Sequence, residues 1–552
     1  MISITKKIWE RYFPFKTIRS QQEDAINFAL NAYINEGKKA VVLELSTGVG
    51  KSATGITIAR YMDAHAPVVK DTEGMPLSGA YVLTTQKILQ EQYMEDFGQK
   101  SGKGLLRTIK SSSNYKCKFY TDQSCSESKK VLSKLGKQLK GTEFEKQCKE
   151  SCTYTLEKSE FIESPLSITN FSYFLAETTY AGRLTPRAML VIDECHNTES
   201  ELSKFVEVSF SEKFARDVLK CKVPKLDSQT AVFEWVSSTY KKSVNKYVKD
   251  LEKNMVKLSD ATEGYSQFSK QYEMLEKHTA KIDQFVELYR EDNWAMNITY
   301  PQEGNKRGAR KFEFKPVDVS KYSNILFRSG ARLLLMSATI VDKDVYCSSI
   351  GLDPKDVAYL RIPSPFPVEN HPIHFVPVGS MSKDYIDKTL PVMAEAVRML
   401  LEKHPNEKGV IHTANYKVAK YILENLKTGR LLSHDSNNRD EVLRKHYESD
   451  EATVLISPSM MEGVDLADDA SRFQILCKIP FPYLGDLVIK KRMDKNKQWY
   501  PYTTAKSIIQ SFGRSIRNEK DYAVSYILDS DWERFYSRNK HMFSEDFNKS
   551  FK

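Results

Sequence analysis

Residues 40–52 have the sequence AVVLELSTGVGKS, a short apolar run that leads into a loop with two glycines, a lysine and a serine. A buried strand, a glycine loop and a helix in this order are typical of a phosphate-binding loop. Glycines let backbone N–H groups approach phosphates, Lys51 offsets the charge of the β- and γ-phosphates, and the Ser52 hydroxyl can bind Mg²⁺. The pattern G-x-x-x-x-G-K-S is incomplete, because Leu45 replaces its first glycine. We predict that a nucleotide binds at Ser46, Thr47, Gly48, Val49, Gly50, Lys51 and Ser52.

A second motif ends another apolar run, AMLVIDECH at residues 188–196. Such a strand can deliver Asp193 to Mg²⁺ and Glu194 to a water molecule, for which Glu194 acts as general base. Taken alone, two acids after an apolar run are more often an ordinary solvent-exposed strand end. The phosphate-binding loop upstream favours the catalytic interpretation, with Ser52 and Asp193 as the magnesium ligands.

A third motif, QSFGRSIR at residues 510–517, lies near the end of the chain. Arg514 and Arg517 are three residues apart, so a helix would place both on one face, from which they could reach a γ-phosphate across a cleft. Taken alone, an isolated G-R-x-x-R motif is more often part of a basic helix that faces solvent.

Short apolar runs recur along the chain, each bounded by polar residues as expected for buried parallel strands. They form two sets, one at residues 40–45, 80–84, 188–192 and 331–336, and the other at residues 409–412, 453–456 and 473–477. Two blocks of alternating strands and helices predict an α/β fold with two doubly wound parallel-sheet lobes.

Two long stretches interrupt the first block. The stretch at residues 102–163 contains four clustered cysteines and many lysines. The stretch at residues 199–323 is mostly helical in pattern, with apolar residues four and three apart at 236–258 and again at 268–282. Two such helices in succession predict an antiparallel hairpin, which could be a structural support or an arch that contacts nucleic acid.

The clustered cysteines are Cys117, Cys125, Cys148 and Cys152, with the spacing C-x7-C-x22-C-x3-C. In a protein expected inside the cell, clustered cysteines indicate a metal rather than disulfides. Four thiolates can hold either Zn²⁺ or a [4Fe–4S] cluster, and this spacing leaves both open.

The composition is that of a globular protein with several domains. The 552 residues include 82 Lys and Arg against 72 Asp and Glu, a net charge of +10 that favours a polyanionic partner. The longest apolar runs are far shorter than a membrane span, and the N-terminal sequence does not resemble a secretory signal. We therefore expect a cytoplasmic protein that does not associate with membranes.

In this order along the chain, the motifs resemble those of superfamily 2 helicases, and specifically of the XPD/DinG family. The resemblance covers nearly the whole chain and includes both interruptions of the first block. Besides the motifs above, the matching positions are Gln22 with Arg19, Thr85-x-x-x-Leu89-x-x-Gln92, Ser337-Ala338-Thr339, Ser364-Pro365-Phe366 and Glu462-Gly463-Val464-Asp465.

The resemblance implies two RecA-like lobes, with an iron–sulfur domain and an arch domain inserted into the first. The first lobe would comprise residues 1–101, 164–198 and 324–365, and the second lobe residues 366–552. The iron–sulfur domain would occupy residues 102–163, and the largely helical arch residues 199–323.

The resemblance also implies the roles of the candidate residues. ATP and Mg²⁺ would bind between the lobes, with Lys51, Asp193 and Glu194 acting from the first and Gln510, Arg514 and Arg517 from the second. Gln22 would contact the adenine, and Asp465 would belong to the nucleotide site. The four clustered cysteines would hold a [4Fe–4S] cluster.

A member of this family is expected to be an ATP-dependent DNA helicase that moves 5′ to 3′. Its partners would be single-stranded DNA and forked or tailed duplexes, in DNA repair, replication or recombination, and we expect a monomer. Two alternatives remain open. One is a translocase or helicase that acts on RNA or hybrids, and the other is a metal-binding interaction protein with a nucleotide switch.

Overall fold

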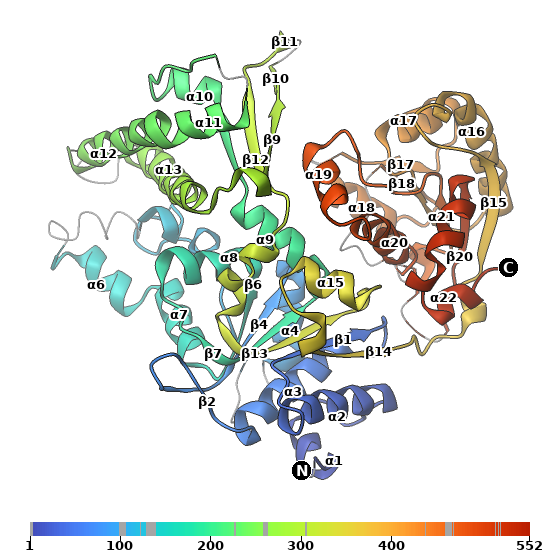
Figure 1. The fold of residues 1–552 in the computed structure, drawn as a ribbon, viewed down its shortest axis with the longest axis horizontal. Coiled ribbons are helices and arrows are strands. Elements are labelled where there is room, and N and C mark those ends of the chain that lie inside the picture. Colours follow the sequence, from blue (N-terminus) through green and yellow to red (C-terminus); the bar gives the residue numbers. More distant parts are fainter. Residues whose placement is uncertain are drawn as a thin grey trace.

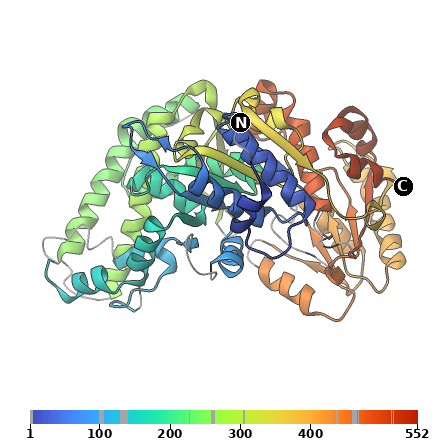
Figure 2. The same ribbon diagram turned by 90° about the horizontal axis from the view of Figure 1, so that it is seen from below.

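Figure 1 shows a computed structural model of the chain. The structure describes residues 4–98, 106–121, 123–128, 140–225, 228–257, 263–303, 306–435, 438–458, 466, 468–513, 515–516, 518 and 520–552. Two parallel sheets form two lobes, and Figure 2 shows the second lobe, orange and red, on one side of the first and the inserted helices, green, on the other.

The first lobe contains a seven-stranded parallel sheet in the order β14-β1-β13-β7-β4-β6-β5. Its strands are β1 (Ala40–Leu45), β4 (Ala80–Thr84), β5 (Leu106–Thr108), β6 (Leu166–Asn170), β7 (Arg187–Asp193), β13 (Gly330–Ser337) and β14 (Val357–Ile362). All residues of β1, β4 and β7 are buried, as in a sheet covered on both faces. The four apolar runs predicted for this lobe are β1, β4, β7 and β13, whereas β5, β6 and β14 are additional.

Strand order brings the motifs of this lobe to one place. Because β1, β13 and β7 are neighbours and all parallel, their carboxyl ends meet at one edge of the sheet. β1 leads into the glycine loop and helix α3 (Lys51–His65), β7 ends at Asp193, and β13 ends at Ser337. Helix α2 (Ser20–Ile34) packs against α3 and carries Gln22 beside the loop.

The second lobe has a six-stranded parallel sheet in the order β15-β20-β19-β16-β18-β17. Its strands are β15 (Ile373–Gly379), β16 (Gly409–His412), β17 (Leu431–Ser433), β18 (Val454–Ser457), β19 (Phe473–Leu476) and β20 (Val524–Asp529), and its helices are α16 (Ile386–Lys403), α17 (Tyr416–Asn425), α18 (Arg439–Glu448), α19 (Leu487–Lys495), α20 (Trp499–Phe512), α21 (Asp531–Asn539) and α22 (Glu545–Lys549). The prediction of two doubly wound lobes is confirmed.

Two groups of elements lie between strands of the first sheet in the sequence. The stretch with the cysteines contains α6 (Glu143–Glu150) and α7 (Thr153–Glu163). The later stretch contains α10 (Glu212–Asp217), α11 (Gln229–Trp235), α12 (Lys241–Lys257) and α13 (Glu263–Leu288). It also contains an antiparallel sheet in the order β8-β12-β9, which the helical pattern does not predict, with strands β8 (Val208–Ser211), β9 (Trp294–Thr299) and β12 (Lys311–Pro316).

The heptad pattern describes the packing of α12 and α13. Leu251 of α12 is buried together with Tyr272 and Leu275 of α13. Away from this contact, the two helices carry charged residues such as Lys241 and Asp283, as amphipathic helices do. In the part of the chain that the structure describes, no helix is long and apolar enough to cross a membrane.

Candidate nucleotide site and cysteine cavity

The loop between β1 and α3 requires glycine at two positions. Gly48 and Gly50 both have φ of 87°, in the left-handed region that favours glycine. A Cβ atom added to Gly48 would lie 2.2 Å from Cζ of Phe366, and one added to Gly50 would lie 2.3 Å from Nε2 of Gln22. Since α3 begins immediately after the loop, its unpaired N–H groups and its dipole favour an anion here.

Lys51 and Glu194 face one another across this edge of the sheet. The Nζ atom of Lys51 lies 3.8 Å from Oε1 of Glu194, and both side chains are only partly exposed. Glu194 follows the last residue of β7 and has φ of 50°, a conformation that non-glycine residues rarely adopt. The bend turns its carboxylate toward Lys51 and the glycine loop, which is the edge of the sheet where the phosphates of a bound nucleotide would lie.

Tyr93 of α4 (Lys87–Phe97) connects the two residues predicted to bind Mg²⁺. Its hydroxyl donates a hydrogen bond of 2.7 Å to Oδ2 of Asp193, and a side-chain hydrogen bond joins the same hydroxyl to Ser52. Asp193 is almost fully buried. Burial foremost, and then the charge of Glu194, raise the pKa of Asp193 to about 6, while Lys51 acts in the opposite direction. A divalent cation at this place would stabilise the ionised carboxylate.

His196 links the acid pair to the end of β13. Its Nδ1 atom lies 2.7 Å from Oγ of Ser337 and 3.3 Å from Oε2 of Glu194. The backbone N–H of Thr339 donates to the same Ser337 hydroxyl over 3.0 Å. The segment that follows β13 is therefore in hydrogen-bonded contact with the residues that follow β7.

Gln22 and Arg19 contact the glycine loop directly. The side chain of Gln22 is buried, accepts from the Arg19 N–H over 2.9 Å and donates to the Gly50 carbonyl over 3.4 Å. The Arg19 guanidinium donates to the Gly48 carbonyl. Both residues thus lie beside the phosphate-binding loop.

The second lobe places Gln510 on α20, and its amide nitrogen is buried without a hydrogen-bond partner among the residues that the structure describes. Arg514, Arg517 and Asp465 lie outside the described residues, as does the segment at 462–465. Upstream on α20, Lys506 donates over 3.3 Å to the His196 carbonyl, so this helix contacts the acid-pair segment of the first lobe.

Helices α19 and α20 also hold the second lobe against α9 (Thr198–Val206), which follows the acid pair. Arg492 lies 2.6 Å from Oε1 of Glu199, and its guanidinium stacks over the Trp499 ring at 4.7 Å. Trp499 donates to the same carboxylate over 3.2 Å. The first turn of α19 reaches the inserted sheet, where Asn297 donates to Asp486 over 3.2 Å.

Two residues, Tyr93 in the site and Glu44 beside it, were not identifiable from motifs. Tyr93 lies one residue beyond the Thr85-x-x-x-Leu89-x-x-Gln92 segment, and a lone tyrosine in an amphipathic helix gives no signal of a contact with an acid 100 positions away. Glu44 interrupts the apolar run of β1 as its one charged residue, and this interruption was a signal that sequence reasoning missed.

The four predicted cysteines line one cavity, here called the cysteine cavity. Its lining residues are Cys117, Lys118, Phe119, Cys125, Ser128, Phe144, Gln147, Cys148 and Cys152. The Sγ atoms of Cys125 and Cys152 lie 3.9 Å apart. Within the described residues, however, no three His, Cys, Asp or Glu side chains lie close enough together to hold one metal ion.

Two of these thiols receive hydrogen bonds from the backbone. Cys152 precedes the first residue of α7, and the effect of burial on its pKa is outweighed by hydrogen bonds from Thr155, Cys125 and the Tyr154 N–H, so the pKa is lowered. The Tyr120 N–H donates to Sγ of Cys117 over 3.3 Å. Donors of this kind favour the thiolate, which is the form that binds metals.

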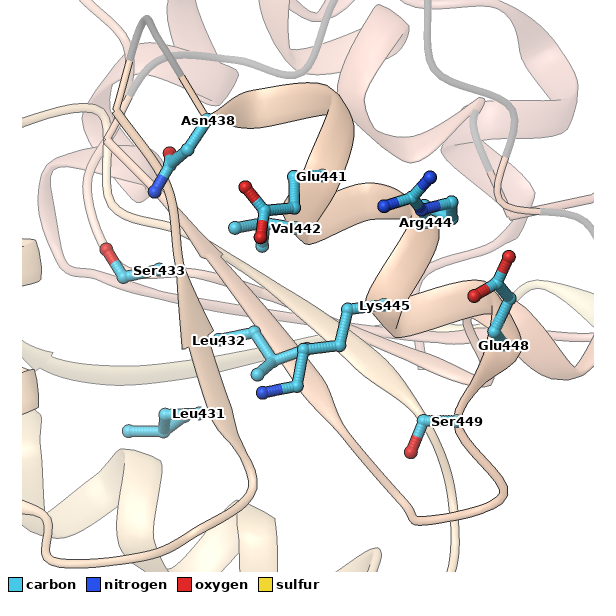
Figure 3. Close-up of a pocket in the computed structure, with 10 residues that line it drawn as sticks. All are labelled: Leu431, Leu432, Ser433, Asn438, Glu441, Val442, Arg444, Lys445, Glu448 and Ser449. Carbon is cyan, nitrogen blue, oxygen red and sulfur yellow. The ribbon is translucent and has the colours of Figure 1, made fainter.

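A separate pocket of about 570 Å³ lies in the second lobe between β17 and α18 (Figure 3). Its rim carries both charges, with Glu441 and Glu448 beside Arg444 and Lys445. None of the predicted site residues lines it, so it is distinct from the nucleotide site.

Two family models match the chain. Residues 15–223 match the model described as type III restriction enzyme, res subunit, and residues 397–550 match the helicase C-terminal domain. The first match spans the glycine loop and the acid pair, and the second spans most of the second lobe with its third motif.

Curated relatives match over shorter segments. The ATP-dependent DNA helicase CHL1 of Candida albicans is 27% identical over 104 residues, which are 16% of this chain and 12% of the relative. A Probable ATP-dependent helicase of Methanocaldococcus jannaschii is 22% identical over 262 residues, 42% of this chain and 40% of the relative. The matched segments thus span well under two thirds of these relatives.

Solved structures share the fold over nearly the whole chain. An XPD helicase structure matches with a TM-score of 0.62 at 15% identity, covering 96% of this chain and 98% of the other. The structure of S. tokodaii Xpd4 matches with a TM-score of 0.57 at 14% identity, covering 97% and 99%. At these identities, the likeness is one of fold.

Proposed function

Because this chain belongs to the XPD/DinG family of superfamily 2 helicases, we propose that it is an ATP-dependent DNA helicase that moves 5′ to 3′ along single-stranded DNA. The observation that carries the proposal is the convergence of Lys51, Asp193 and Glu194 at one sheet edge, beside a second α/β lobe whose helix α20 contacts the acid-pair segment.

In the proposed reaction, the first lobe binds the triphosphate and aligns the attacking water. The N–H groups of the glycine loop and the Lys51 ammonium bind the β- and γ-phosphates. Glu194 takes a proton from the water that attacks the γ-phosphate. Ser52 and Asp193 would hold Mg²⁺, which supplies charge neutralisation at the β- and γ-oxygens.

The second lobe would complete the site from the other side of the cleft. By resemblance to the family's last motif, Arg514 and Arg517 would stabilise the negative charge that develops on the γ-phosphate. Gln510 would contact the attacking water. Closure of the lobes around ATP and their opening after hydrolysis would then move one DNA strand relative to the protein.

The cysteine cavity is proposed to hold a [4Fe–4S] cluster. Its donor set of four cysteines suits such a group, and backbone N–H groups already favour the thiolates. Four thiolates can hold either Zn²⁺ or such a cluster, and the preference for the cluster comes from the resemblance to the XPD/DinG family. When bound, the cluster would serve as a rigid element of the domain beside the DNA path.

The test is strand separation by anaerobically purified protein with ATP, on duplexes that differ only in a 5′ or a 3′ single-stranded tail. The proposal expects opening of the 5′-tailed DNA and little opening of the 3′-tailed DNA. The protein should absorb in the visible range and contain about four iron atoms per chain.

The same assay distinguishes the alternatives. Opening of RNA or hybrid forks but not of DNA forks would show that the protein acts on RNA or hybrids instead of DNA. ATP hydrolysis with no opening of any duplex would indicate a translocase. Absence of hydrolysis with every nucleic acid would leave a nucleotide-controlled interaction protein, and zinc in place of iron would overturn the cluster assignment.

A further inference from the structure

Glu44 is a buried carboxylate that the proposed reaction does not use. It lies on β1, two residues before Ser46 and the glycine loop, and its side chain is 5% exposed. Its neighbours in the strand are apolar and buried. An ionised carboxylate in such a place costs stability unless every oxygen is paired, so its presence calls for a specific role.

Both oxygens of Glu44 are fully used, by partners from two other strands or their continuations. Oε1 accepts from the backbone N–H groups of Ile340 over 3.0 Å and Val341 over 3.1 Å. Oε2 accepts from the Tyr359 hydroxyl and lies 2.9 Å from Nε of Arg361, whose Nη2 donates to Oε1 over 3.0 Å. The arrangement is a two-point Arg–carboxylate pair with three further donors.

The first partner segment is the turn that follows Ser337-Ala338-Thr339. Val341 has φ of 69°, which is costly for a β-branched residue and persists only where contacts hold it. The hydrogen bond from its N–H to Glu44 is such a contact. Because Ser337 in turn contacts His196, the turn is joined through a short path to the acid pair.

The second partner segment is β14, which leads into the connection between the lobes. Arg361 lies opposite Glu44 in the parallel register, and Tyr359 lies two residues earlier on the same face. After β14, the Ile362 carbonyl accepts from the N–H and the hydroxyl of Ser46, and Phe366 packs against Gly48. The glycine loop and the lobe connection are therefore in contact directly after Glu44 and its partner Arg361.

The second lobe packs close to this network. Tyr502 of α20 is buried in one apolar cluster with Ile340 and Tyr346, and burial first, then nearby negative charges that include Glu199 and Glu44, raise the pKa of its hydroxyl. Tyr346 of α15 (Lys343–Ser349) donates over 3.0 Å to the Cys195 carbonyl. Helix α20 leads to the third motif, so the network lies between the glycine loop and the part of the second lobe that would approach the phosphates.

We propose that Glu44 is a positioning residue that couples the glycine loop to the turn after Ser337-Ala338-Thr339 and to the connection between the lobes. One rigid carboxylate holds all three segments, so a shift of the loop on nucleotide binding is passed to β14 and α20 rather than absorbed locally. The inference rests on the proposed function, because it concerns how hydrolysis and DNA movement are linked.

The test compares Glu44→Gln and Tyr359→Phe with the unmodified protein. Glu44→Gln keeps the size and one acceptor oxygen but loses the charge that binds Arg361, and Tyr359→Phe removes one hydrogen bond while it keeps the ring. The control is Glu212→Gln, which removes the charge from a two-point pair with Arg310 at the end of the inserted sheet, where Glu212 follows β8 and Arg310 precedes β12. ATP hydrolysis is measured with and without single-stranded DNA, together with KM for ATP and base pairs opened per ATP.

In Glu44→Gln, we expect DNA stimulation of hydrolysis and base pairs opened per ATP to fall about 10-fold, the size of a typical coupling effect. DNA-free hydrolysis and KM for ATP should stay within about threefold of the unmodified values, as for a residue that does not touch the nucleotide. Tyr359→Phe should show the same pattern at smaller size, and it carries the test if Glu44→Gln does not fold.

Three results would overturn the inference. The first is full DNA stimulation in folded variants. The second is a loss confined to KM for ATP, which would make Glu44 a support of the nucleotide pocket alone. The third is a comparable loss in Glu212→Gln, since the loss of any Arg–carboxylate pair would then have the same effect. Absence of DNA-stimulated hydrolysis in the unmodified protein would instead remove the proposed function, and the inference with it.

Discussion

The nucleotide site and the cysteine cavity differ in how the chain holds their functional groups. At the nucleotide site, Lys51 faces Glu194 and Tyr93 binds Asp193, so protein partners occupy each charged group. In the cysteine cavity, four thiols line one space, and the Sγ atoms of Cys125 and Cys152 lie 3.9 Å apart. The first site is organised by the chain itself.

The difference indicates what holds the functional side chains of each region in place. A site with paired charges keeps its geometry between catalytic cycles, because each group has a partner when the substrate has left. A site made of thiols gains most of its organisation from the metal that binds them, since metal binding and folding are coupled. Substitutions should therefore act on chemistry in the first region and on local structure in the second.

The largest effect is expected for Lys51→Ala. Loss of the ammonium that binds the phosphates should lower ATP hydrolysis by about 10²–10³-fold, as for other groups that stabilise transition-state charge. Binding of single-stranded DNA should change little, because the fold of the lobe does not depend on Lys51. Steady-state hydrolysis and fluorescence anisotropy measure the two quantities.

The matched control is Lys38→Ala, at a lysine of the same lobe that donates over 3.0 Å to the Lys355 carbonyl, away from the glycine loop. It should hydrolyse ATP at nearly the unmodified rate. Strong DNA-stimulated hydrolysis by Lys51→Ala would contradict the assignment of the nucleotide site.

A second effect, about 10-fold or more in strand separation, is expected for Cys148→Ser, because the domain loses one of four cluster ligands. Hydrolysis of ATP should persist, since the nucleotide site is organised without the cysteine cavity. Iron content and visible absorption should fall together with strand separation. Cys221→Ala removes a buried thiol outside the cavity and should keep the iron.

If Cys148→Ser opened duplexes as fast as the unmodified protein, the cluster would have no part in strand separation. If it lost hydrolysis as completely as Lys51→Ala, the two regions would not be independent, and the contrast between them would fail.

The smallest effect concerns the stability of the protein without nucleotide and Mg²⁺. The pKa of Asp193 is raised to about 6, by burial first and by Glu194 second. A carboxyl whose pKa is higher in the folded state destabilises the fold when ionised, fully above the folded pKa and progressively less as pH falls toward the unfolded value near 3.9. Asp193→Asn should therefore raise the free energy of unfolding at pH 8 by about 1–3 kcal/mol, and by less at pH 5.

Denaturant unfolding at the two pH values measures this effect, with Asp494→Asn as the control at an exposed carboxyl of α19. The same Asp193→Asn variant should lose ATP hydrolysis, so stability and activity would change in opposite directions. A variant less stable than the unmodified protein at pH 8 would show that the Tyr93 hydrogen bond outweighs the cost of burial.

Much of the fold was predictable from local patterns. The apolar runs at 40–45, 80–84 and 409–412 have the bounds of β1, β4 and β16 as the structure gives them, because strands buried on both faces have continuous apolar sequences. Strands such as β5 and β17 have three residues each, too few for a pattern. The sheet β8-β12-β9 was missed because its strands lie far apart in a stretch dominated by helical spacing.

The sequence by itself determined the two α/β lobes, the glycine loop, the acid pair and the four candidate metal ligands. Each depends on residues within a few positions of one another, and the backbone geometry of a strand, loop or helix start acts over that range. The order of the motifs along the chain then gave the resemblance to the XPD/DinG family.

Only the tertiary structure decided which distant residues meet. The adjacency of β1, β13 and β7, the place of Tyr93 between Ser52 and Asp193, and the partners of Glu44 all join segments that lie between 41 and 317 residues apart. Such contacts are selected by packing and by the need to pair buried polar groups, and neither requirement leaves a periodic trace in the sequence.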